Sequence, residues 1–362
     1  MEIGIPRELK PWEGRVGLVP EAAAELVQAG HRVWIEAGAG EAAGYPDASY
    51  ERLGVMVAAE PAELYARARL IVKVKEPVAE DLPHLRPEHL LFCYLHLAAN
   101  PELARRLCAI GLTAIAFETV QAADGTLPLL TPMSLVAGRI AGQVGATLLY
   151  RPQGGRGLLL GGLPAAERGR VSVLGAGHAG GAAATVAAAL GAEVVVFDRR
   201  PDRLEAMRTL GPNVTALYPY ADSIDRAVRE SDLLIGAVLI PGARTPRLVR
   251  REQVAAMRPG SVVIDISVDQ GGCIETTRPT TWEHPTFVES GVVHFAVTNM
   301  PGAVPRSASL ALSAALTPWV ARIASDPEWR SDPVLAAGIN VDRGRLVHPT
   351  VREALEGLRV AG

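Results

Sequence analysis

One stretch decides the fold of this chain: Val171-Ser-Val-Leu-Gly175-Ala-Gly177-His-Ala-Gly180. It has the pattern of a strand, a glycine turn and the start of a helix of small residues. Gly175 permits a tight turn, Gly177 lets the backbone approach a pyrophosphate, and Gly180 lets the helix lie close to the strand. The N-terminus of such a helix offers backbone N–H donors and a positive dipole end. The pattern predicts a βαβ unit that binds a dinucleotide.

The second half of this unit, Gly191-Ala-Glu-Val-Val-Val-Phe-Asp198, ends in a carboxylate. An acid at this place accepts hydrogen bonds from the adenosine ribose hydroxyls. Arg199 and Arg200 follow directly and would suit the 2′-phosphate of NADP, but the Asp198 carboxylate would repel that phosphate. We therefore expect NAD as the cofactor.

Composition and charge describe an ordinary globular chain. Its 362 residues give room for two domains, and a hydrophobic content of 49% with a net charge of −3 offers no basic face for nucleic acid. The odd number and wide spacing of Cys93, Cys108 and Cys273 predict free thiols in a reducing compartment. The N-terminal residues lack a leader-like apolar core, and no apolar run has the length of a membrane span. We expect a cytoplasmic protein with neither a nucleic-acid nor a membrane partner.

Strand-like and helix-like segments alternate along the chain, which predicts an α/β fold of two doubly wound, Rossmann-like domains. In the first part, the expected strands are 31–36, 70–75, 90–95 and 113–117, and the expected helices are 20–29 and 101–110. A Gly/Ala-rich helix at 133–150 precedes the second run of strands, which starts at 171 and continues through 233–238, 261–266 and 292–297. From about residue 307 the pattern turns helical, and 338–348 has the pattern of a short hairpin.

The dinucleotide unit lies in the middle of the chain. We therefore predict an NAD-binding Rossmann domain over 129–306 and a discontinuous substrate and catalytic domain made of 1–128 plus 307–362. The cleft between the two domains is the expected site, because ligand sites favour domain interfaces.

Residues that do chemistry in a doubly wound sheet gather at the carboxyl ends of strands. Four predicted strand ends carry such residues: Lys75, His96, Asp269 and the loop Asn299–Pro305. The Lys75 ammonium suits an anion, the His96 imidazole suits proton transfer near neutral pH, and the Asp269 carboxylate suits activation of water. Each has a plain structural alternative: a solvated cation, a structural histidine, a turn aspartate and a domain hinge.

Of the 36 lysines and arginines only three are lysines: Lys10, Lys73 and Lys75. A lysine kept in an arginine-rich chain indicates a task for a compact ammonium. Lys73 and Lys75 are two apart, so both are expected on one face of a strand. Arg15 can pair with Lys75 to bind a substrate carboxylate, arginine giving the bidentate contact. Cys93 and His96 have the spacing of a metal pair, but no second pair accompanies them, so no metal site is predicted.

Seven motifs follow one another along nearly the whole chain: Gly4-Ile-Pro-Arg-Glu8, Arg15-Val, Val72-Lys-Val-Lys75-Glu-Pro77, Tyr94-Leu-His96, Gly175–Gly180, Asp265–Gly272 and Asn299-Met-Pro-Gly-Ala-Val-Pro305. Together they resemble the alanine dehydrogenase family, whose broader group includes the nucleotide-binding subunit of proton-pumping transhydrogenase and the saccharopine dehydrogenases. Transhydrogenase carries an Arg-Ala-Gln loop where this chain has Thr131-Pro-Met-Ser134, and it usually differs at Asp269-Gln270. Both points favour the dehydrogenase.

The resemblance implies reversible oxidative deamination of L-alanine by NAD to pyruvate, ammonium and NADH. By residue-to-residue match, Arg15 and Lys75 would bind the substrate carboxylate and the keto or imino oxygen. His96 would be the general acid/base at the carbinolamine and imine steps, and Asp269 would activate water or ammonia. The implied partners are small molecules, and the family is usually a homohexamer.

The resemblance also assigns the cofactor contacts. Ser134 would contact phosphate, and Asp198 and Arg203 the adenosine ribose region. The nicotinamide side would be contacted by Leu239, Asp269 and Asn299. The full cofactor-binding set is Ser134, Gly175, Gly177, His178, Gly180, Asp198, Arg203, Leu239, Asn299 and Met300. His178 would approach the pyrophosphate through its backbone, and its side chain receives no role. Tyr220 stands where the family often has a serine, so nothing is assigned there.

Three other functions stay open on the sequence. A catalytically silent NAD sensor would bind NAD and catalyse no reaction. An NAD(H)-binding subunit of a transhydrogenase-like assembly would bind NAD without turning over any amino acid. A saccharopine-type dehydrogenase would act on lysine and 2-oxoglutarate.

Overall fold

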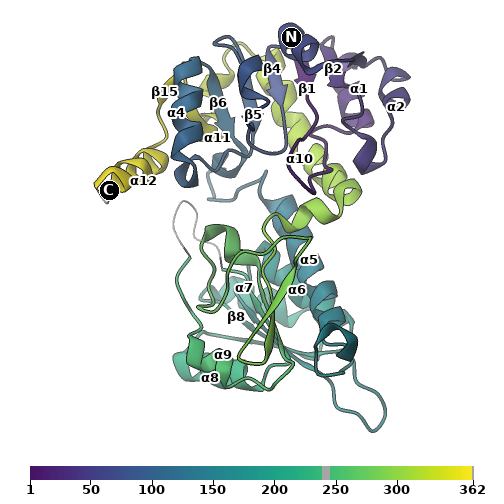
Figure 1. The fold of residues 1–362 in the computed structure, drawn as a ribbon, viewed down its shortest axis with the longest axis vertical. Helices are drawn as coiled ribbons and strands as arrows, with labels where there is room; N and C mark the ends of the chain where they lie inside the picture. The colour runs from purple at the N-terminus through teal and green to yellow at the C-terminus, as the bar shows by residue number, and fades with distance from the viewer. Residues whose placement is uncertain (239–244, 361–362) are drawn as a thin grey trace. The chain divides into compact units, whose positions relative to one another are not determined.

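The computed structural model describes residues 1–238 and 245–360. The chain forms two compact units: unit 1 consists of Met1–Met133 and Gly302–Gly362, and unit 2 of Ser134–Pro301. Unit 1 is discontinuous because the C-terminal segment folds onto the N-terminal sheet. Strand β14 (Ile339–Asp342) of this segment pairs with β6 (Thr113–Ala116). Figure 1 shows the yellow C-terminal segment in the same unit as the blue N-terminal strands.

In the described residues, unit 1 has an eight-stranded sheet in the order β15-β14-β6-β5-β4-β1-β2-β3. The strands are β1 (Glu2–Ile5), β2 (Arg32–Glu36), β3 (Met56–Ala58), β4 (Leu70–Val72), β5 (Leu90–Cys93), β6 (Thr113–Ala116), β14 (Ile339–Asp342) and β15 (Arg345–Leu346). The first six pair in parallel, whereas β14 pairs antiparallel with β6 and β15. Every residue of β4, β5 and β6 is buried, so both faces of the sheet are covered at its centre.

The helices of unit 1 begin and end at the expected signals. They are α1 (Pro20–Gln28), α2 (Asp47–Glu51), α3 (Pro61–Arg67), α4 (Pro101–Ile110), α10 (Pro305–Ser325), α11 (Pro333–Gly338) and α12 (Pro349–Val360). At the start of α4, the Asn100 side chain accepts a hydrogen bond from Leu103 N at 3.1 Å, and Gly111 ends the helix with a φ of +88°.

One feature of unit 1 differs from the sequence prediction. The strand predicted over 70–75 ends at Val72, so Lys73 and Lys75 lie beyond it and do not share one strand face. Helix α10 runs unbroken through Pro318. Its apolar stripe, which includes Leu316 and Val320, is fully buried, and this packing outweighs the hydrogen bond lost at the proline.

Unit 2 has a seven-stranded sheet among the described residues, in the order β12-β13-β11-β10-β7-β8-β9. Its strands are β7 (Arg170–Leu174), β8 (Glu193–Phe197), β9 (Val214–Leu217), β10 (Leu233–Gly236), β11 (Val262–Asp265), β12 (Thr286–Glu289) and β13 (Val292–Phe295). All pairs are parallel except β12 with β13. The strand order reverses between β7 and β10, which is where a doubly wound sheet binds its ligand. The predicted α/β fold with doubly wound sheets is confirmed.

The helices of unit 2 are α5 (Thr131–Leu148, which starts in unit 1), α6 (His178–Ala189), α7 (Pro201–Arg208), α8 (Ala221–Glu230) and α9 (Arg251–Ala255). The glycines of α5 allow close helix packing: a Cβ on Gly138 would lie 2.0 Å from the backbone oxygen of Ala179 in α6. None of the described helices is both long and apolar enough to span a membrane.

Candidate active site

The glycine turn between β7 and α6 has the geometry that a dinucleotide needs. Gly175 has a φ of +100°, which favours glycine, and a Cβ on Gly180 would lie only 1.7 Å from the Gly175 backbone oxygen. A Cβ on Gly177 would meet only Arg203 Nη1, at 3.6 Å, so the space beside this residue is open. Gly177 caps α6 without a side-chain hydrogen bond, which leaves the first turn of the helix for an anion.

Asp198 lies directly after β8 and is tied to this turn. Its Oδ2 accepts a hydrogen bond from Ala176 N at 2.8 Å, and its Oδ1 accepts one from Arg200 N at 2.9 Å. Arg203 Nη1 lies 3.5 Å from Asp198 Oδ2. The structure thus brings the predicted turn, Asp198 and Arg203 together. A carboxylate has about four acceptor positions, so these contacts leave capacity for ribose hydroxyls.

The loops after β10 and β11 lie at the same edge of the unit 2 sheet. Ser267 Oγ donates to Val238 O at 2.8 Å, and a Cβ on Gly175 would lie 2.6 Å from Ala237 O. Asp269 is exposed on the short helix Ile266–Gln270, which follows β11. The loop end that precedes Leu239 therefore adjoins the glycine turn, and Leu239 itself lies outside the described residues.

The buried carboxylate of Asp265 holds the loop that carries Asp269. Asp265 accepts hydrogen bonds from Ser267 N at 3.0 Å, Cys273 N at 2.9 Å and Ile274 N at 3.2 Å. Burial raises the pKa of Asp265 above its ordinary value, and these backbone hydrogen bonds partly oppose that shift. The buried Asp265 carboxylate thus joins the two ends of the loop from 266 to 274 by hydrogen bonds.

The remaining predicted cofactor residues have these places. Ser134 is half-buried on α5, and His178 is the exposed first residue of α6. Asn299 has a φ of +59° in the loop after β13, and Met300 beside it is buried. All four lie in unit 2.

Arg15 lies in unit 1 and is held by a buried carboxylate. Its Nε donates to Glu13 Oε1 at 2.7 Å, and its Nη2 forms an ion pair with Glu13 Oε2. Burial works to lower the pKa of Arg15, but the hydrogen bonds and charge of Glu13 raise it above its ordinary value, so the guanidinium stays charged. The segment that follows is fixed by helix α10, because Val16 N donates to Ser309 Oγ at 3.0 Å and Val19 N to Ser313 Oγ at 2.9 Å.

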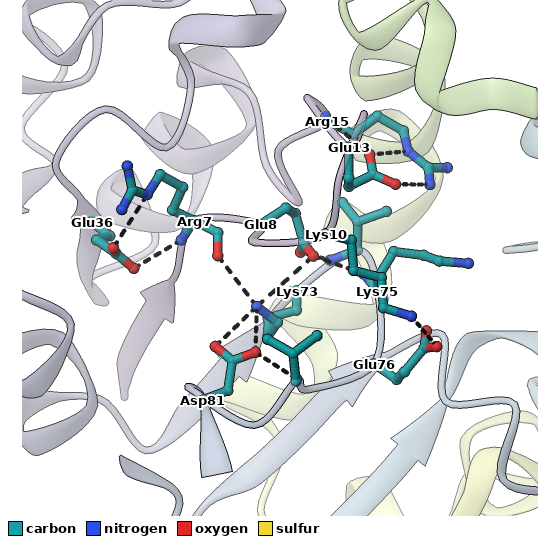
Figure 2. A network of polar contacts seen from close by, with 12 residues as sticks. Arg7, Glu8, Lys10, Glu13, Arg15, Glu36, Lys73, Lys75, Glu76 and Asp81 are labelled. Carbon is teal, nitrogen blue, oxygen red and sulfur yellow. Dashed lines mark hydrogen bonds and ion pairs between the residues drawn. The ribbon is translucent and has the colours of Figure 1, made fainter. Parts of the chain in front are cut away.

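Lys73 belongs to a buried ionic network (Figure 2). Its Nζ lies 3.3 Å from Asp81 and 3.8 Å from Glu8 Oε2, and it donates to Arg7 O at 3.3 Å. Burial works to lower the pKa of Lys73, but Glu8 and Asp81 raise it above its ordinary value. Its side chain has no exposed surface, so Lys73 is a structural countercharge and not a substrate ligand.

Lys75 differs from the other two lysines. Lys10 forms an ion pair with Glu76, and Lys73 is enclosed by acids. Lys75 is half-buried, and its ammonium forms no salt bridge in the part of the chain that the structure describes. Its charge still acts on Glu76: burial works to raise the pKa of Glu76, but Lys75 and Lys10 bring it below its ordinary value. The lysine predicted to bind substrate is therefore the one whose ammonium can take a new anion.

His96 follows β5 in a left-handed conformation with a φ of +49°. Its ring stacks on Tyr94, with centroids 5.9 Å apart and an interplanar angle of 3°. Its Nδ1 lies 3.9 Å from Glu118 Oε1, and its side chain is 43% exposed. An accessible imidazole next to a carboxylate suits proton transfer.

The predicted residues of unit 1 are linked by contacts and by charge interactions. Lys75 N donates to Glu8, Glu8 and Arg15 interact through their charges, and the charge of Arg15 acts on Tyr94, which stacks on His96. Figure 2 shows Arg15, Glu13, Glu8 and Lys75 in one region of the unit. Two cations and a histidine thus lie in the segments that follow the neighbouring strands β1, β4 and β5.

The described residues contain no cluster of three or more histidines, cysteines or acids that would hold a metal ion. A cavity of about 450 Å³ in unit 1 is lined by Lys10, Glu76, Asn100 and Arg106 among others, and the predicted catalytic residues are not part of its wall.

Comparison with known proteins identifies the family. The model "Alanine dehydrogenase/PNT, N-terminal domain" matches residues 4–137, and "Alanine dehydrogenase/PNT, C-terminal domain" matches 141–349. Alanine dehydrogenase of Halomonas elongata is 48% identical over 98% of this chain and 96% of its own length. The chain belongs to the alanine dehydrogenase family. Alanine dehydrogenase of Bacillus subtilis is 45% identical over 98% of this chain and 95% of its own length.

Solved structures agree with this family. An L-alanine dehydrogenase superposes with a TM-score of 0.95 at 48% identity and covers 99% of this chain and 100% of its own. A transhydrogenase from Sinorhizobium meliloti superposes with a TM-score of 0.85 at 28% identity over 96% of this chain and 100% of its own. The family predicted from the sequence motifs is confirmed.

Sequence reasoning missed the acids that hold the alanine dehydrogenase motifs in place: Glu8, Glu13, Asp81, Glu118 and Asp265. They have the appearance of surface acids in the sequence. A signal was present in the sequence for two of these acids. Glu8 ends the first family motif, and Glu13 precedes Arg15 by two residues. No local pattern marks Glu118 as the partner of His96, because the two are brought together by neighbouring strands.

Proposed function

We propose that this protein catalyses the reversible NAD-dependent oxidative deamination of L-alanine to pyruvate and ammonium. Its relatives in the family carry the name alanine dehydrogenase at 44–48% identity over nearly the whole chain. The observation that carries the proposal is that this chain combines a dinucleotide turn closed by Asp198 with Arg15, Lys75 and His96 in the segments that follow neighbouring strands of unit 1. Unit 1 would then be the substrate and catalytic domain, and unit 2 the NAD-binding domain.

The residues of unit 2 fit NAD. The open space beside Gly177 and the start of α6 would hold the pyrophosphate, and Asp198 with Arg203 would hold the adenosine ribose. Ser134, His178, Leu239, Asn299 and Met300 complete the proposed set. When bound, NAD accepts a hydride from the substrate, and NADH returns it in the reverse reaction.

Arg15 and Lys75 would bind the substrate anion. Pyruvate and alanine are small and carry a carboxylate that must lose its water shell on binding. A guanidinium held rigid by Glu13 offers directed N–H donors, and the Lys75 ammonium adds a point charge for the carboxylate or the keto oxygen. The charge of Arg15 is not free of Glu13, so Lys75 supplies the less compensated positive charge.

His96 and Asp269 would move the protons. In deamination the ammonium group of alanine first loses a proton, and the Cα–H bond then breaks with loss of hydride, which leaves an iminium. Water adds to Cα with loss of a proton, and the carbinolamine loses ammonia as its hydroxyl becomes the keto group. Asp269 would accept the proton of the attacking water. His96 would give a proton to the leaving nitrogen and take one from the hydroxyl, because an imidazole can both donate and accept a proton.

The proposal is tested by following NADH absorbance with the purified protein. NADH should be consumed when pyruvate and ammonium are both present, and omission of either should stop the reaction. L-Alanine with NAD should give the reverse change. NADH binding without turnover would contradict the proposal and favour a partner-dependent subunit, and activity on lysine with 2-oxoglutarate would favour a saccharopine-type dehydrogenase.

We further propose that the protein acts as a homohexamer in the cytoplasm. The family resemblance supports the hexamer, and the three free cysteines agree with a reducing compartment. Light scattering on the purified protein should give a mass near six times the 38.2 kDa of one chain. A monomer mass would contradict the hexamer.

A further inference from the structure

Two glutamates of unit 1 make the same contact beside two different functional residues. Glu8 Oε1 accepts from Val74 N at 2.6 Å, and its Oε2 accepts from Lys75 N at 3.3 Å. Glu118 accepts from Leu95 N at 3.2 Å and from His96 N at 2.6 Å. In each case one carboxylate holds two successive backbone amides, and the second belongs to the residue proposed to touch substrate.

The sheet order explains how both pairs arise. Glu8 follows β1, the neighbour of β4, and Glu118 follows β6, the neighbour of β5. The carboxyl ends of parallel strands meet at one edge, so an acid from one strand reaches the amides of the next. The amides beyond β4 and β5 have left the sheet ladder. Those of Val74 and Leu95 belong to buried residues, and without the carboxylates they would have no acceptor there.

Both carboxylates are costly to bury, which argues against a passive role. The Glu8 side chain is 3% exposed and the Glu118 side chain 16%. Burial raises the pKa of Glu8, and the Lys73 charge partly offsets this. Lys73 lies between Glu8 and Asp81 with no exposed surface, so a buried cation is also required to keep Glu8 in place (Figure 2).

The backbone of His96 gives an independent reason for the Glu118 contact. A left-handed φ costs a non-glycine residue roughly 1–2 kcal/mol, and such strain persists only where the surroundings enforce it. The hydrogen bond from His96 N to Glu118 at 2.6 Å is one such constraint, and the stacking on Tyr94 is another.

We infer that Glu8 and Glu118 are positioning residues that fix the backbones of Lys75 and His96, and so aim the ammonium at the substrate anion and the imidazole at the reacting nitrogen and oxygen. This inference rests on the proposed function. A misplacement of about 1 Å can cost two orders of magnitude in rate, so a backbone constraint of this kind carries weight.

Isosteric variants test the inference. In Glu8→Gln and Glu118→Gln, the new amide NH₂ faces a backbone N–H that the carboxylate had accepted, so the two-amide contact is lost. Glu8→Gln should raise KM for pyruvate about tenfold or more, and Glu118→Gln should lower kcat about tenfold or more. The dissociation constant of NADH, measured by fluorescence titration, should stay unchanged in both.

One further variant separates positioning from general loss of stability. Asp332→Asn removes a buried acid that also holds two successive amides, Val334 N at 2.8 Å and Leu335 N at 3.2 Å, at the start of α11. It should lower Tm and leave KM and kcat within about twofold, well below a tenfold effect.

The outcomes divide clearly. If Glu8→Gln and Glu118→Gln keep the wild-type KM and kcat, or if Asp332→Asn changes them as much, the inference is wrong. If Glu8→Gln does not fold, Glu8→Asp keeps the charge but is one methylene too short to hold both amides, and it should still raise KM. A wild-type protein that fails to turn over pyruvate and ammonium contradicts the proposed function instead.

Discussion

The carboxylate of Asp198 accepts a hydrogen bond from the backbone of Ala176 at 2.8 Å, so the acid proposed to bind ribose also closes the glycine turn proposed to bind pyrophosphate. One residue therefore links two parts of the cofactor site. Its side chain is 10% exposed, which places it at the boundary between the protein interior and the ligand.

Asp198→Ala removes both the hydrogen bond from Ala176 N and the proposed contact with the ribose. We expect the dissociation constant of NADH to rise about ten- to hundredfold, because each tenfold step corresponds to about 1.4 kcal/mol of lost binding energy. Asp198→Asn keeps one acceptor oxygen and should have a smaller effect. Fluorescence titration measures both, and an unchanged dissociation constant in Asp198→Ala would contradict the assignment.

Gly180→Ala and Gly177→Ala should fail in different ways. The first places a Cβ 1.7 Å from Gly175 O, so β7 and α6 must separate, and we expect a loss of unit 2 stability visible in Tm. The second places a Cβ in open space at a φ of −71°, so the fold should survive while NADH binding weakens. Equal effects on Tm would show that the Gly177 backbone has no special relation to the cofactor.

His96→Ala should abolish turnover and leave cofactor binding intact. General acid–base groups contribute about 10²–10⁴-fold to rate, and we expect kcat to fall by that factor. The dissociation constant of NADH should stay at the wild-type value because His96 lies in unit 1 and the proposed cofactor residues lie in unit 2. Loss of NADH binding would show that the histidine has another task.

Asp265→Asn should reveal a stability term that depends on pH. Burial raises the pKa of Asp265 above its ordinary value of 3.8, so the native state holds the proton more tightly than the unfolded state does. The stability contributed by this group is therefore greatest below that value and is lost as the pH rises through the native pKa. The variant lacks this term and loses an acceptor for buried amides, which costs about 1–3 kcal/mol.

Denaturant titrations of both proteins at a series of pH values measure the difference. Wild type should be the more stable at each pH, and its advantage should shrink as the pH rises. An advantage that grows with pH would contradict the direction of the pKa shift.

The three thiols should react in a fixed order. Cys93 and Cys273 are fully buried, and burial raises the pKa of both well above the ordinary value, so little thiolate is present at neutral pH. Cys108 is only partly buried, and its pKa is raised as well. Iodoacetamide should modify Cys108 first in the native protein and all three in denaturant, as read by peptide mass mapping. Native labelling of Cys93 at the rate of Cys108 would contradict the packing around β5.

The parts of the fold that rest on local signals could be predicted from the sequence. Gly175, Gly177 and Gly180 act within one turn and one helix, and Asn100 caps its own helix. The C-terminal hairpin could also be predicted from the sequence. Its pairing with β6 could not, because Ile339 pairs with Ile115, which is far away in the sequence.

The residues proposed to touch the substrate could be predicted from the sequence, but the buried acids behind them could not. Their spacing in the sequence gives Lys73 and Lys75 the same predicted orientation. In the structure they differ, because β4 ends at Val72 and the buried acids Glu8 and Asp81 enclose Lys73 alone. A carboxylate that accepts a hydrogen bond from a backbone amide far away in the sequence is not marked by any pattern in the residues around it. The structure was therefore needed to find Glu8 and Glu118.

The most direct test of the central claim is the fate of nitrogen. Purified protein is given NADH, pyruvate and isotopically labelled ammonium, and the products are analysed by mass spectrometry. The account predicts L-alanine that carries the heavy nitrogen, formed in equal amount to the NADH consumed. NADH consumed without labelled alanine, or no consumption by a protein that binds NADH, would contradict it.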